Sequence, residues 1–569
     1  MATVAAPADL LDVTTTDALQ EKKKLRKHFA RFDIVFFLIC TLVGVDTLGA
    51  VASNGPQAFT WLIFLAILFF VPYALLTAEL GTAFPEEGGP YIWTRLAFGR
   101  RVAAVNGLIY WVSNPIWVGG TLGITALAAI ETFFNQGNSL PGAKILGGAT
   151  LVDVVFVLAF IWFTVGAAII SFSIGKWVPT IGAFMRSLLL GFFTISVVIY
   201  ATKNGIHNTF GGGAFRPSYA IFIAAVPVLI FNYVGFELPS AAGEEMKNPQ
   251  RDVPVGVARS AVGTVLLYGL PILAILLLLP KGQVTGLTGF LAAIKSVFTV
   301  YGGHFAANGT PVLTGAGKAL GYVMAVAFVL ALLTSGTTWI MGADRAQAMA
   351  ALDGAGPRFL GRFSARFGTP IAVNLCSGIT ATAVMVLAFA ITGGNALKYF
   401  TVVLGLVIST TTISYIVIFP ALIKLRRSHP HVERPYRVPG GMPMVWIVGG
   451  LCTFWAVLAS IVLVYPGFGT NWFGQHGNPD SSLPTGFTRM QFELSQIIPL
   501  GILLIVGILF YVAGAPTRRH AVTVPIAQEM GIGKASDAGP AAAAEGPHLS
   551  DSGLVGDSGA GPSNPEPTD

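Results

Sequence analysis

Charged residues are scarce in this chain of 569 residues. Asp, Glu, Lys and Arg together make up 11% of it, against about 25% in a soluble globular domain. Hydrophobic residues make up 54%, and the mean hydropathy is +0.70. This balance excludes an ordinary soluble domain and predicts an integral membrane protein that is surrounded by the lipid bilayer. The net charge of +7 then reflects which side the loops face, and we expect no nucleic-acid partner.

Cysteine is also rare, and no group of residues has the spacing of a catalytic or metal site. Cys40, Cys376 and Cys452 all lie within apolar runs, where neither a disulfide framework nor a thiolate metal site is expected. The histidines lack metal-ligand spacing, and the sequence contains no nucleophile elbow or phosphate-binding loop. The sequence therefore predicts a protein that is not an enzyme and that uses no cofactor or metal.

Long apolar runs dominate what is present. A bilayer core of about 30 Å requires roughly 20 apolar residues in a helix, and twelve stretches meet this requirement. Lys and Arg favour one side of the predicted membrane by twenty-four to eight, so both termini are expected on the cytoplasmic side of the plasma membrane. The twelve expected spans are 33–54, 58–84, 103–134, 150–170, 177–201, 219–242, 256–280, 318–343, 371–392, 397–423, 444–465 and 493–513.

Two of these spans are interrupted by residues that loosen a helix, and each interruption carries an acid. Gly44 and Gly49 flank Asp46 in the first span, and Gly235 precedes Glu237 in the sixth. A carboxylate at the bilayer centre costs on the order of 3 kcal/mol on insertion scales, and glycine lets the backbone leave helical geometry. Broken spans at corresponding places in two halves of a chain are typical of transporters that bind substrate near the membrane midplane.

Several short motifs give the sequence a family resemblance. The most specific is the run from Glu237 to Pro254, which leaves the sixth span through Lys247-Asn248-Pro249. The others are Pro85-Glu86-Glu87-Gly88-Gly89-Pro90-Tyr91, Phe98-Gly99-Arg100, Asp344-Arg345 with Asp353-Gly354 and Pro357, Gly368-Thr369-Pro370, and Arg434-Pro435-Tyr436-Arg437-Val438-Pro439-Gly440. Together these motifs resemble the amino acid–polyamine–organocation superfamily of permeases from about Phe32 to Tyr511.

The resemblance implies an all-α integral membrane protein with twelve transmembrane helices. Members of that superfamily have an inverted 5+5 repeat of the LeuT-like kind and two peripheral helices, and their first and sixth helices unwind mid-membrane. The corresponding layout here is a basic cytoplasmic N-terminal segment at 1–32, a transporter domain at 33–513 and a disordered cytoplasmic tail at 514–569. Within the transporter domain we expect repeat one at 33–201, repeat two at 219–423 and the peripheral helices at 444–513.

Residues at the two breaks are the candidate substrate contacts. Asp46 can bind the ammonium group of a substrate, carry a coupling proton or pair with an internal cation such as Arg186. Glu237 can contact substrate or organise the unwound segment, and Phe231 resembles an aromatic residue that closes over substrate in the family. The full candidate set is Gly44, Asp46, Thr47, Gly49, Trp117, Phe231, Asn232, Tyr233, Gly235 and Glu237.

Three further residues are candidates for ion coupling. Arg186 lies in the fifth span, near where some superfamily members place a lysine that occupies the sodium site of sodium-coupled relatives. Arginine stays charged at physiological pH, so Arg186 would act either as a fixed cation that makes sodium unnecessary or as a structural partner for an internal acid. Ser335 and Thr338 in the eighth span can line a cation site or bond to carbonyls of their own helix.

These observations predict a secondary active transporter of amino acids or related organic amines that works by alternating access. We expect it to be sodium-independent, and either proton-coupled or an exchanger, with a small-molecule substrate and a monomeric or homodimeric state. One alternative is a polyamine or ethanolamine-type permease that uses Asp46 and Glu237 as counter-ions. Another is a substrate-gated channel or sensor on the same fold. A major facilitator transporter fits twelve spans but would lack the paired breaks.

Overall fold

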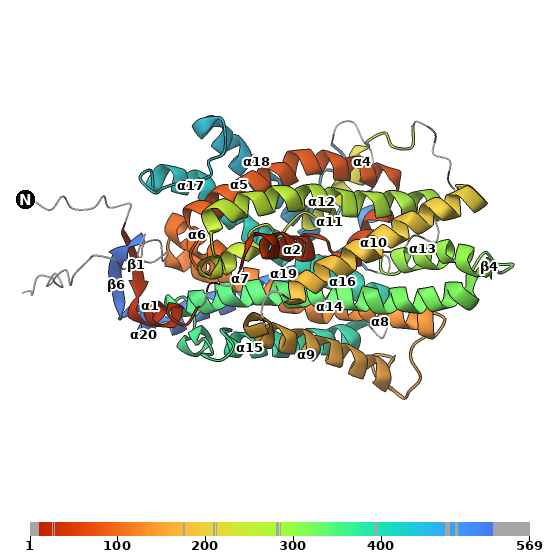
Figure 1. Cartoon of the computed structure of the whole chain (residues 1–569), viewed down its shortest axis with the longest axis horizontal. Coiled ribbons are helices and arrows are strands. Elements are labelled where there is room, and N and C mark those ends of the chain that lie inside the picture. The colour runs from red at the N-terminus through yellow and green to blue at the C-terminus, as the bar shows by residue number, and fades with distance from the viewer. Residues whose placement is uncertain are drawn as a thin grey trace, which may run out of the picture. The chain divides into compact units, whose positions relative to one another are not determined.

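The structure of the chain, a computed structural model, is built mainly from helices (Figure 1). It describes residues 11–526 apart from 26, 28, 175–176, 207, 209–210, 212, 280–283, 285, 393–395, 473–477 and 484–486. The helices are α1 (Thr16–Lys22), α2 (Arg31–Leu42), α3 (Leu48–Ala52), α4 (Pro56–Leu65), α5 (Val71–Ala83), α6 (Gly89–Phe98), α7 (Arg100–Trp117), α8 (Gly123–Phe134), α9 (Leu151–Ile174), α10 (Trp177–Asn204), α11 (Tyr219–Phe231), α12 (Pro249–Leu278), α13 (Gly289–Phe298), α14 (Gly315–Leu352), α15 (Ile371–Thr392), α16 (Ala396–Ile418), α17 (Ala421–Ser428), α18 (Gly441–Val464), α19 (Arg489–Ala513) and α20 (Ala515–Arg518).

Eleven helical stretches in the described residues are long and apolar enough to cross a membrane. The prediction of a mostly helical membrane protein is therefore confirmed. The expected span 219–242 is not among the eleven, because its helix α11 stops at Phe231 and short 3-10 turns follow. The first expected span also changes geometry: α2 ends at Leu42, a 3-10 turn covers Val45–Thr47, and α3 begins at Leu48.

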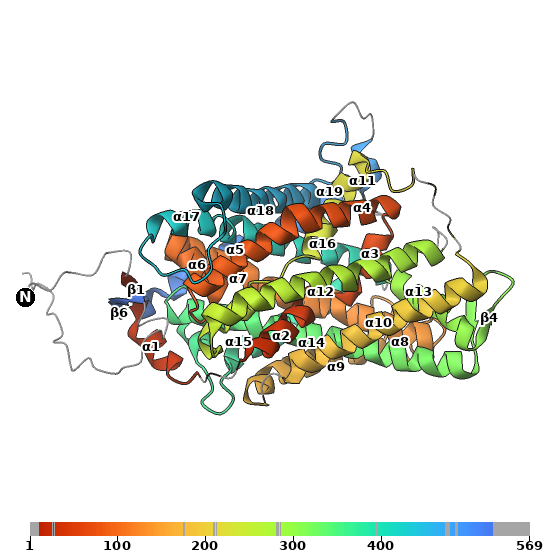
Figure 2. The same cartoon turned by 45° about the horizontal axis from the view of Figure 1, so that its top comes forward.

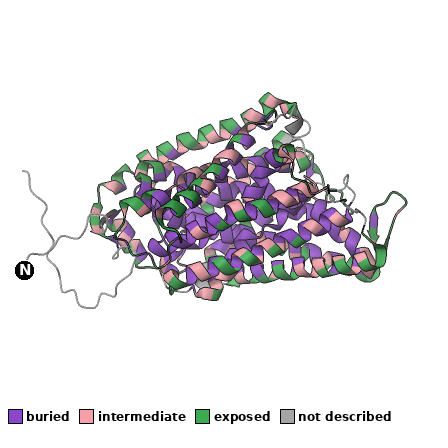
Figure 3. Cartoon of the chain, turned by 90° about the horizontal axis from the view of Figure 1, so that it is seen from above, coloured by how far each residue is buried: buried purple, intermediate pink, exposed green. Residues whose placement is uncertain are grey.

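Many large apolar residues are exposed on the helices. The buried residues gather inside the helical body (Figure 3). Phe163 on α9 and Ile391 on α15 expose 71% and 78% of their surface. In water such faces would cost free energy in proportion to their apolar area, whereas lipid tails solvate them. Exposure of large apolar residues is thus what a membrane location requires.

Helix packing places the first break at the centre of the bundle. α12 packs on α2 and α5, and α10 packs on α14 and α2. α7 in turn packs on α14 and α16. The short α2 lies among α10, α12 and α14 in both orientations (Figures 1 and 2). Side chains from α7, α10, α12 and α14 can therefore all reach the point where α2 ends.

Proline shapes the long stretch formed by α4 and α5. Five residues between these helices, Ala66–Phe70, form a π-helical turn, and Pro72 follows at the second position of α5. Proline has no backbone N–H and disturbs the preceding turn, which leaves the Leu68 carbonyl to another donor. The indole of Trp455 on α18 supplies it, with Nε1 3.0 Å from the Leu68 oxygen. The distortion thus joins α18 to this stretch.

Three two-stranded antiparallel sheets accompany the described helices. β1 (Leu11–Thr15) pairs with β6 (Ala521–Pro525), β2 (Lys144–Leu146) with β3 (Ala149–Thr150), and β4 (Gly303–Phe305) with β5 (Pro311–Leu313). The β1–β6 sheet lies at one end of the helical body and β4 at the opposite end (Figures 1 and 2).

The start of the segment expected to be disordered, 514–569, is ordered instead. It forms α20 and then β6, which faces β1 along its whole length. Val522 and Val524 favour extended structure, and β1 offers an edge with which they can pair. Composition alone missed this because the partner strand lies at the other end of the chain. Residues 527–569 of the expected tail lie outside the described residues.

Candidate functional site

The backbone between α2 and α3 leaves helical geometry. Its carbonyl groups accept hydrogen bonds from side chains of other helices instead of from helical amides. Val43 and Gly44 have φ/ψ of −93°/82° and −79°/114°. The Thr41 carbonyl accepts a hydrogen bond from Trp339 Nε1 at 3.1 Å, and the Val43 carbonyl accepts one from Arg186 Nε at 2.9 Å. Side chains of α14 and α10 thus satisfy polar groups that would otherwise be buried without partners.

Asp46 lies in the 3-10 turn of this first break and is 3% exposed. Its Oδ2 accepts a hydrogen bond from the indole Nε1 of Trp117 at 2.9 Å. Its Oδ1 is buried and has no hydrogen-bond partner among the described residues. Among the residues that the structure describes, no nitrogen of Arg186 lies within 4.0 Å of an Asp46 oxygen, although the Arg186 charge acts on Asp46. One oxygen of a buried carboxylate is therefore left available to a ligand.

The second break begins where α11 ends, at Phe231. Gly235 has a φ of +125°, and a Cβ there would lie 2.8 Å from Thr41 Cγ2, so this position requires glycine. Asn232 joins the two breaks, because its Oδ1 accepts a hydrogen bond from the Thr47 hydroxyl. Its Nδ2 is buried without a partner in the described structure.

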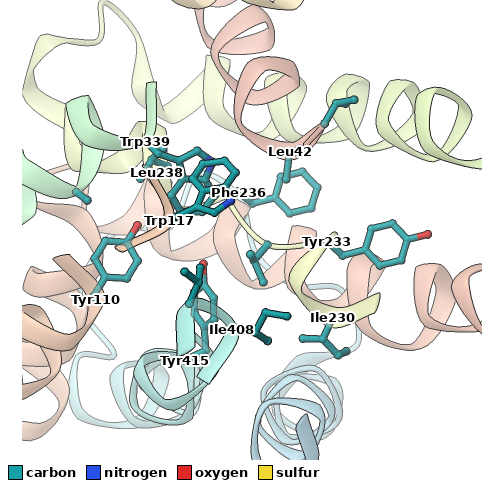
Figure 4. Close-up of a cluster of buried hydrophobic side chains, with 14 of the residues drawn as sticks. Leu42, Tyr110, Trp117, Ile230, Tyr233, Phe236, Leu238, Trp339, Ile408 and Tyr415 are labelled. Carbon is teal, nitrogen blue, oxygen red and sulfur yellow. The ribbon is translucent and has the colours of Figure 1, made fainter. Parts of the chain in front are cut away.

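Both breaks border one small cavity with a volume of about 20 Å³. Such a volume suffices for about one water molecule, so its walls must separate before an organic substrate can enter. Trp117 contacts Phe231 and Trp339 in edge-to-face geometry, with ring centroids 6.3 and 5.9 Å apart; Trp117 and Trp339 lie together in Figure 4. The lining consists of Thr41, Leu42, Gly44, Asp46, Thr47, Trp117, Phe231, Asn232, Val234, Tyr268 and Trp339.

Glu237, the acid of the second break, is fully buried among phenol hydroxyls. Its Oε1 accepts hydrogen bonds from Tyr110 at 2.8 Å and from Tyr415 at 2.7 Å, and its Oε2 accepts one from Tyr73. The hydroxyls of Tyr110 and Tyr415 point toward the same part of the cluster in Figure 4. Glu237 is not part of the cavity lining. Both of its oxygens are satisfied within the protein.

Arg186 occupies the space between α2, α10 and α14. Besides its bond to Val43, its guanidinium donates to the Cys40 sulfur at 3.0 Å and to the Ala331 carbonyl. Ser335 Oγ donates to the Cys40 carbonyl at 3.3 Å, while Thr338 Oγ1 donates to a carbonyl of its own helix at 2.7 Å. The three coupling candidates thus meet around the end of α2, with the guanidinium at the centre.

The structure brings six of the ten substrate candidates to the cavity and leaves four outside its lining. The six are Gly44, Asp46, Thr47, Trp117, Phe231 and Asn232. Among the other four, Tyr233 stacks on Phe70 and donates its hydroxyl to the Leu62 carbonyl at 3.1 Å. It points away from Trp117 and Trp339 in Figure 4. Gly49, Gly235 and Glu237 complete this group.

Sequence reasoning missed Tyr268 on α12 and Trp339 on α14. Tyr268 Oη accepts a hydrogen bond from the Gly44 amide at 2.7 Å, and both residues line the cavity. Each is an aromatic residue in a long apolar run, a context in which most aromatic residues face lipid or core. A signal was nevertheless present, because a tyrosine or tryptophan buried in an apolar helix usually needs a hydrogen-bond partner.

Charged residues cluster at the β1–β6 end of the bundle. Arg345 Nη1 lies 2.6 Å from Glu87 and 2.9 Å from Glu245, and Lys22 lies 2.8 Å from Glu244. Burial raises the pKa of Glu87, and the charges of the neighbouring carboxylates raise it further against the opposing effect of Arg345. Burial likewise raises the pKa of Glu245. Lys22 was expected in a basic terminal segment, but it is buried in this cluster.

Comparison with known proteins identifies a family model and several transporters. Residues 29–475 match the family model described as amino acid permease. The probable agmatine/putrescine antiporter AguD of Lactococcus lactis is 26% identical over 442 residues, which cover 77% of this chain and 87% of that protein. The cadaverine/lysine antiporter of Escherichia coli K12 is 25% identical over 375 residues, covering 64% and 74%. An uncharacterized transporter of Legionella pneumophila is 28% identical over 438 residues, covering 76% and 89%.

Proposed function

The chain belongs to the amino acid permease family, and from that premise we propose that it carries organic amines across the plasma membrane by alternating access. The family and the named relatives are permeases and antiporters, not enzymes, and the chain is a membrane transporter of amino acids or amines. Two relatives are named for agmatine, putrescine, cadaverine and lysine. All four compounds carry an ammonium group, which is the group that our proposal places in the site.

The observation that carries this proposal is the free oxygen of Asp46. A buried carboxylate with an unsatisfied oxygen is costly unless a cation or donor pairs with it. An ammonium group supplies both a positive charge and hydrogen-bond donors. Trp117, Trp339 and Phe231 also line the cavity, and an aromatic ring whose face meets a cation favours it by about 0.5–2 kcal/mol. Asp46 is therefore the proposed counter-ion of the substrate amine.

Alternating access requires the cavity to open toward each side of the membrane in turn. We propose that the chain forms twelve transmembrane helices in two inverted repeats, with the breaks after α2 and α11 at the midplane and both termini in the cytoplasm. The ion pairs of Arg345 and Lys22 would then close the cytoplasmic side. Opening would separate these pairs, while movement of Phe231 and Trp117 would enlarge the cavity from its volume of about 20 Å³.

The position of Arg186 supports transport without sodium. Its guanidinium donates to carbonyls at the end of α2 and on α14, where a bound cation would otherwise find ligands. Arginine does not release its proton in proteins, so we assign Arg186 the role of a fixed cation. This arrangement favours exchange as the mode of coupling. One amine would be exchanged for another compound of similar charge, and Arg186 would neither bind nor release an ion.

The alternative in which Glu237 is a second counter-ion has less support. Tyr73, Tyr110 and Tyr415 donate to both of its oxygens, so an ammonium group would have to displace them. A channel or sensor on the same fold predicts a different kinetic behaviour. Flux through a channel does not show acceleration by substrate on the opposite side, whereas flux through an exchanger does.

The test is uptake of labelled agmatine and putrescine by proteoliposomes that contain the purified full-length protein. We expect uptake to saturate, to increase when the vesicles are preloaded with amine, and to be unchanged when potassium replaces sodium. Asp46→Asn keeps the shape of the side chain and an acceptor for Trp117, but it removes the charge. Its uptake should fall about 10- to 100-fold, as expected for loss of a charge-assisted hydrogen bond of about 1.5–3 kcal/mol.

Thermal unfolding without substrate checks that Asp46→Asn is folded. If a folded Asp46→Asn protein takes up amine at the wild-type rate, Asp46 is not the counter-ion of the substrate amine. Amine flux without acceleration by preloaded substrate would favour the channel. No amine uptake by the wild-type protein, together with uptake of neutral amino acids, would overturn the proposed substrate class.

A further inference from the structure

A tyrosine hydroxyl covers a backbone amide at each of the two breaks. Tyr268 on α12 accepts a hydrogen bond from the Gly44 amide at 2.7 Å. Tyr73 on α5 accepts one from the Gly235 amide at 3.1 Å. The two arrangements differ in one respect that matters for substrate: Tyr268 lines the cavity beside Asp46, whereas Tyr73 donates to Glu237 outside it.

The Gly44 amide is a group that a carboxylate ligand would seek. It lies in the extended backbone between α2 and the turn Val45–Thr47, and a backbone N–H there needs an acceptor from outside the helix, which a carboxylate can supply. Here the Tyr268 hydroxyl already occupies that donor. An incoming carboxylate would have to displace the hydroxyl, which is itself buried and would lose this bond.

The remaining polar groups of the cavity also disfavour an anion. Asp46 lines the cavity of about 20 Å³, and its Oδ1 has no hydrogen-bond partner among the described residues, so a second carboxylate there would lie next to a like charge. Like charges brought together out of water repel strongly. Among the side-chain donors of the described lining, the neutral Nδ2 of Asn232 is the one without a hydrogen-bond partner. The cavity is therefore suited to a cationic group and poorly suited to a zwitterionic one.

We propose that Tyr268 is a specificity-determining residue that, together with Asp46, selects amines without an α-carboxylate over the corresponding α-amino acids. This inference rests on the proposed function and names its substrate class more narrowly. Asp46 provides the attraction to the ammonium group that both kinds of compound share. Tyr268 removes the amide that would bind the carboxylate that only the amino acid has.

Three pairs of compounds isolate this difference, because within each pair only the α-carboxylate distinguishes the two members. They are agmatine and arginine, putrescine and ornithine, and cadaverine and lysine. Competition of each compound against labelled agmatine, with purified full-length protein in detergent, gives the affinity ratio within a pair. For wild-type protein we expect the amine to bind at least 10-fold more tightly than its amino acid in all three pairs.

Tyr268→Phe keeps the ring but exposes the Gly44 amide. A hydrogen bond between an amide and a charged carboxylate contributes about 1.5–3 kcal/mol. Arginine, ornithine and lysine should therefore bind to Tyr268→Phe at least about 10-fold more tightly than to the wild-type protein. The affinity for the three amines should change much less. Tyr73→Phe is the matched control, since it removes the equivalent hydroxyl at the second break, outside the cavity, and should leave the three ratios unchanged.

Tyr268 could instead have a purely structural role, in which its hydrogen bond only holds α12 to the first break. That role predicts a different result. Tyr268→Phe would then weaken both members of each pair by the same factor and leave the ratios as they are. That outcome, or equal binding of both members by the wild-type protein, overturns the inference while amine binding itself upholds the proposed function. Absence of any amine binding by the wild type would instead contradict the proposed function, and the inference with it.

A ligand-side experiment covers the case in which Tyr268→Phe does not fold. Arginine amide has the shape of arginine but carries a neutral carboxamide in place of the carboxylate. Because the repulsion from Asp46 then disappears, arginine amide should bind to wild-type protein at least 5-fold more tightly than arginine. Equal affinities for arginine and arginine amide would show that the carboxylate charge is not what the site rejects, which would overturn the inference.

Discussion

Asp46 and Glu237 lie at the two breaks, after α2 and after α11, yet their surroundings are opposite. Three phenol hydroxyls donate to Glu237, and they satisfy both of its oxygens. One indole donates to Oδ2 of Asp46, a residue of the cavity lining, and its Oδ1 has no partner among the described residues. An acid in a broken apolar span thus has two possible uses. When the protein satisfies it, the acid holds elements together; when the protein leaves an oxygen free, the acid can bind a ligand.

The largest expected difference between the two acids is in stability. Glu237→Ala leaves the hydroxyls of Tyr73, Tyr110 and Tyr415 without their acceptor, and each buried group left unsatisfied costs about 1–3 kcal/mol. Asp46→Ala leaves one indole N–H unsatisfied. The unfolding midpoint in detergent without substrate should therefore fall considerably further for Glu237→Ala. An equal or larger fall for Asp46→Ala would break the comparison.

The second expected difference is in ligand affinity. Asp46→Asn should weaken the binding of agmatine about 10- to 100-fold, since it removes the charge that pairs with the ammonium group. Glu237→Gln keeps an acceptor for the phenols, and the change lies outside the cavity lining, so affinity should change less than about threefold. Isothermal titration of the two purified variants measures both effects. A large loss in Glu237→Gln with unchanged stability would restore Glu237 as a counter-ion.

The smallest effect is expected at a third buried acid, Glu87, whose surroundings combine a cation with further acids. Burial raises the pKa of Glu87 above its ordinary value of 4.5. The folded protein then binds more protons than the unfolded chain between pH 4.5 and the raised pKa, so stability should decrease as the pH rises through that interval. The temperature of the unfolding midpoint should fall by roughly a few degrees between pH 5 and pH 8.5. Glu87→Gln should flatten the profile, whereas an unchanged slope would show that another group causes it.

The sequence was sufficient for the features that depend on local patterns. Scarce charge and long apolar runs correctly predicted a helical membrane protein, and the motifs after Glu237 and around Gly88 led to the correct family. A glycine two residues before an acid also lies shortly after the ends of α2 and α11. Each of these signals extends over a few neighbouring residues, so one chain is enough to detect it.

The distinction between Asp46 and Glu237 could not be predicted because it depends on residues far away in the chain. The partners of Glu237 come from α5, α7 and α16, and the aromatic wall beside Asp46 comes from α7, α11 and α14. Tyr268 resembles other tyrosines in apolar helices until its hydroxyl is seen 2.7 Å from the Gly44 amide. Which of two similar acids is satisfied is a property of the packed bundle, and a single sequence does not display packing.

The pairing of β1 with β6 constrains how the protein is made. Leu11 faces Pro525, about 500 residues later in the chain, so this sheet cannot form until the ribosome has synthesised every membrane helix. Contacts between such distant residues carry a high entropic cost and form late. β1 therefore has no β6 partner while the membrane helices are being inserted. Completion of the β1–β6 sheet would mark a fully assembled molecule, and a chain truncated before Ala521 would lack that final step.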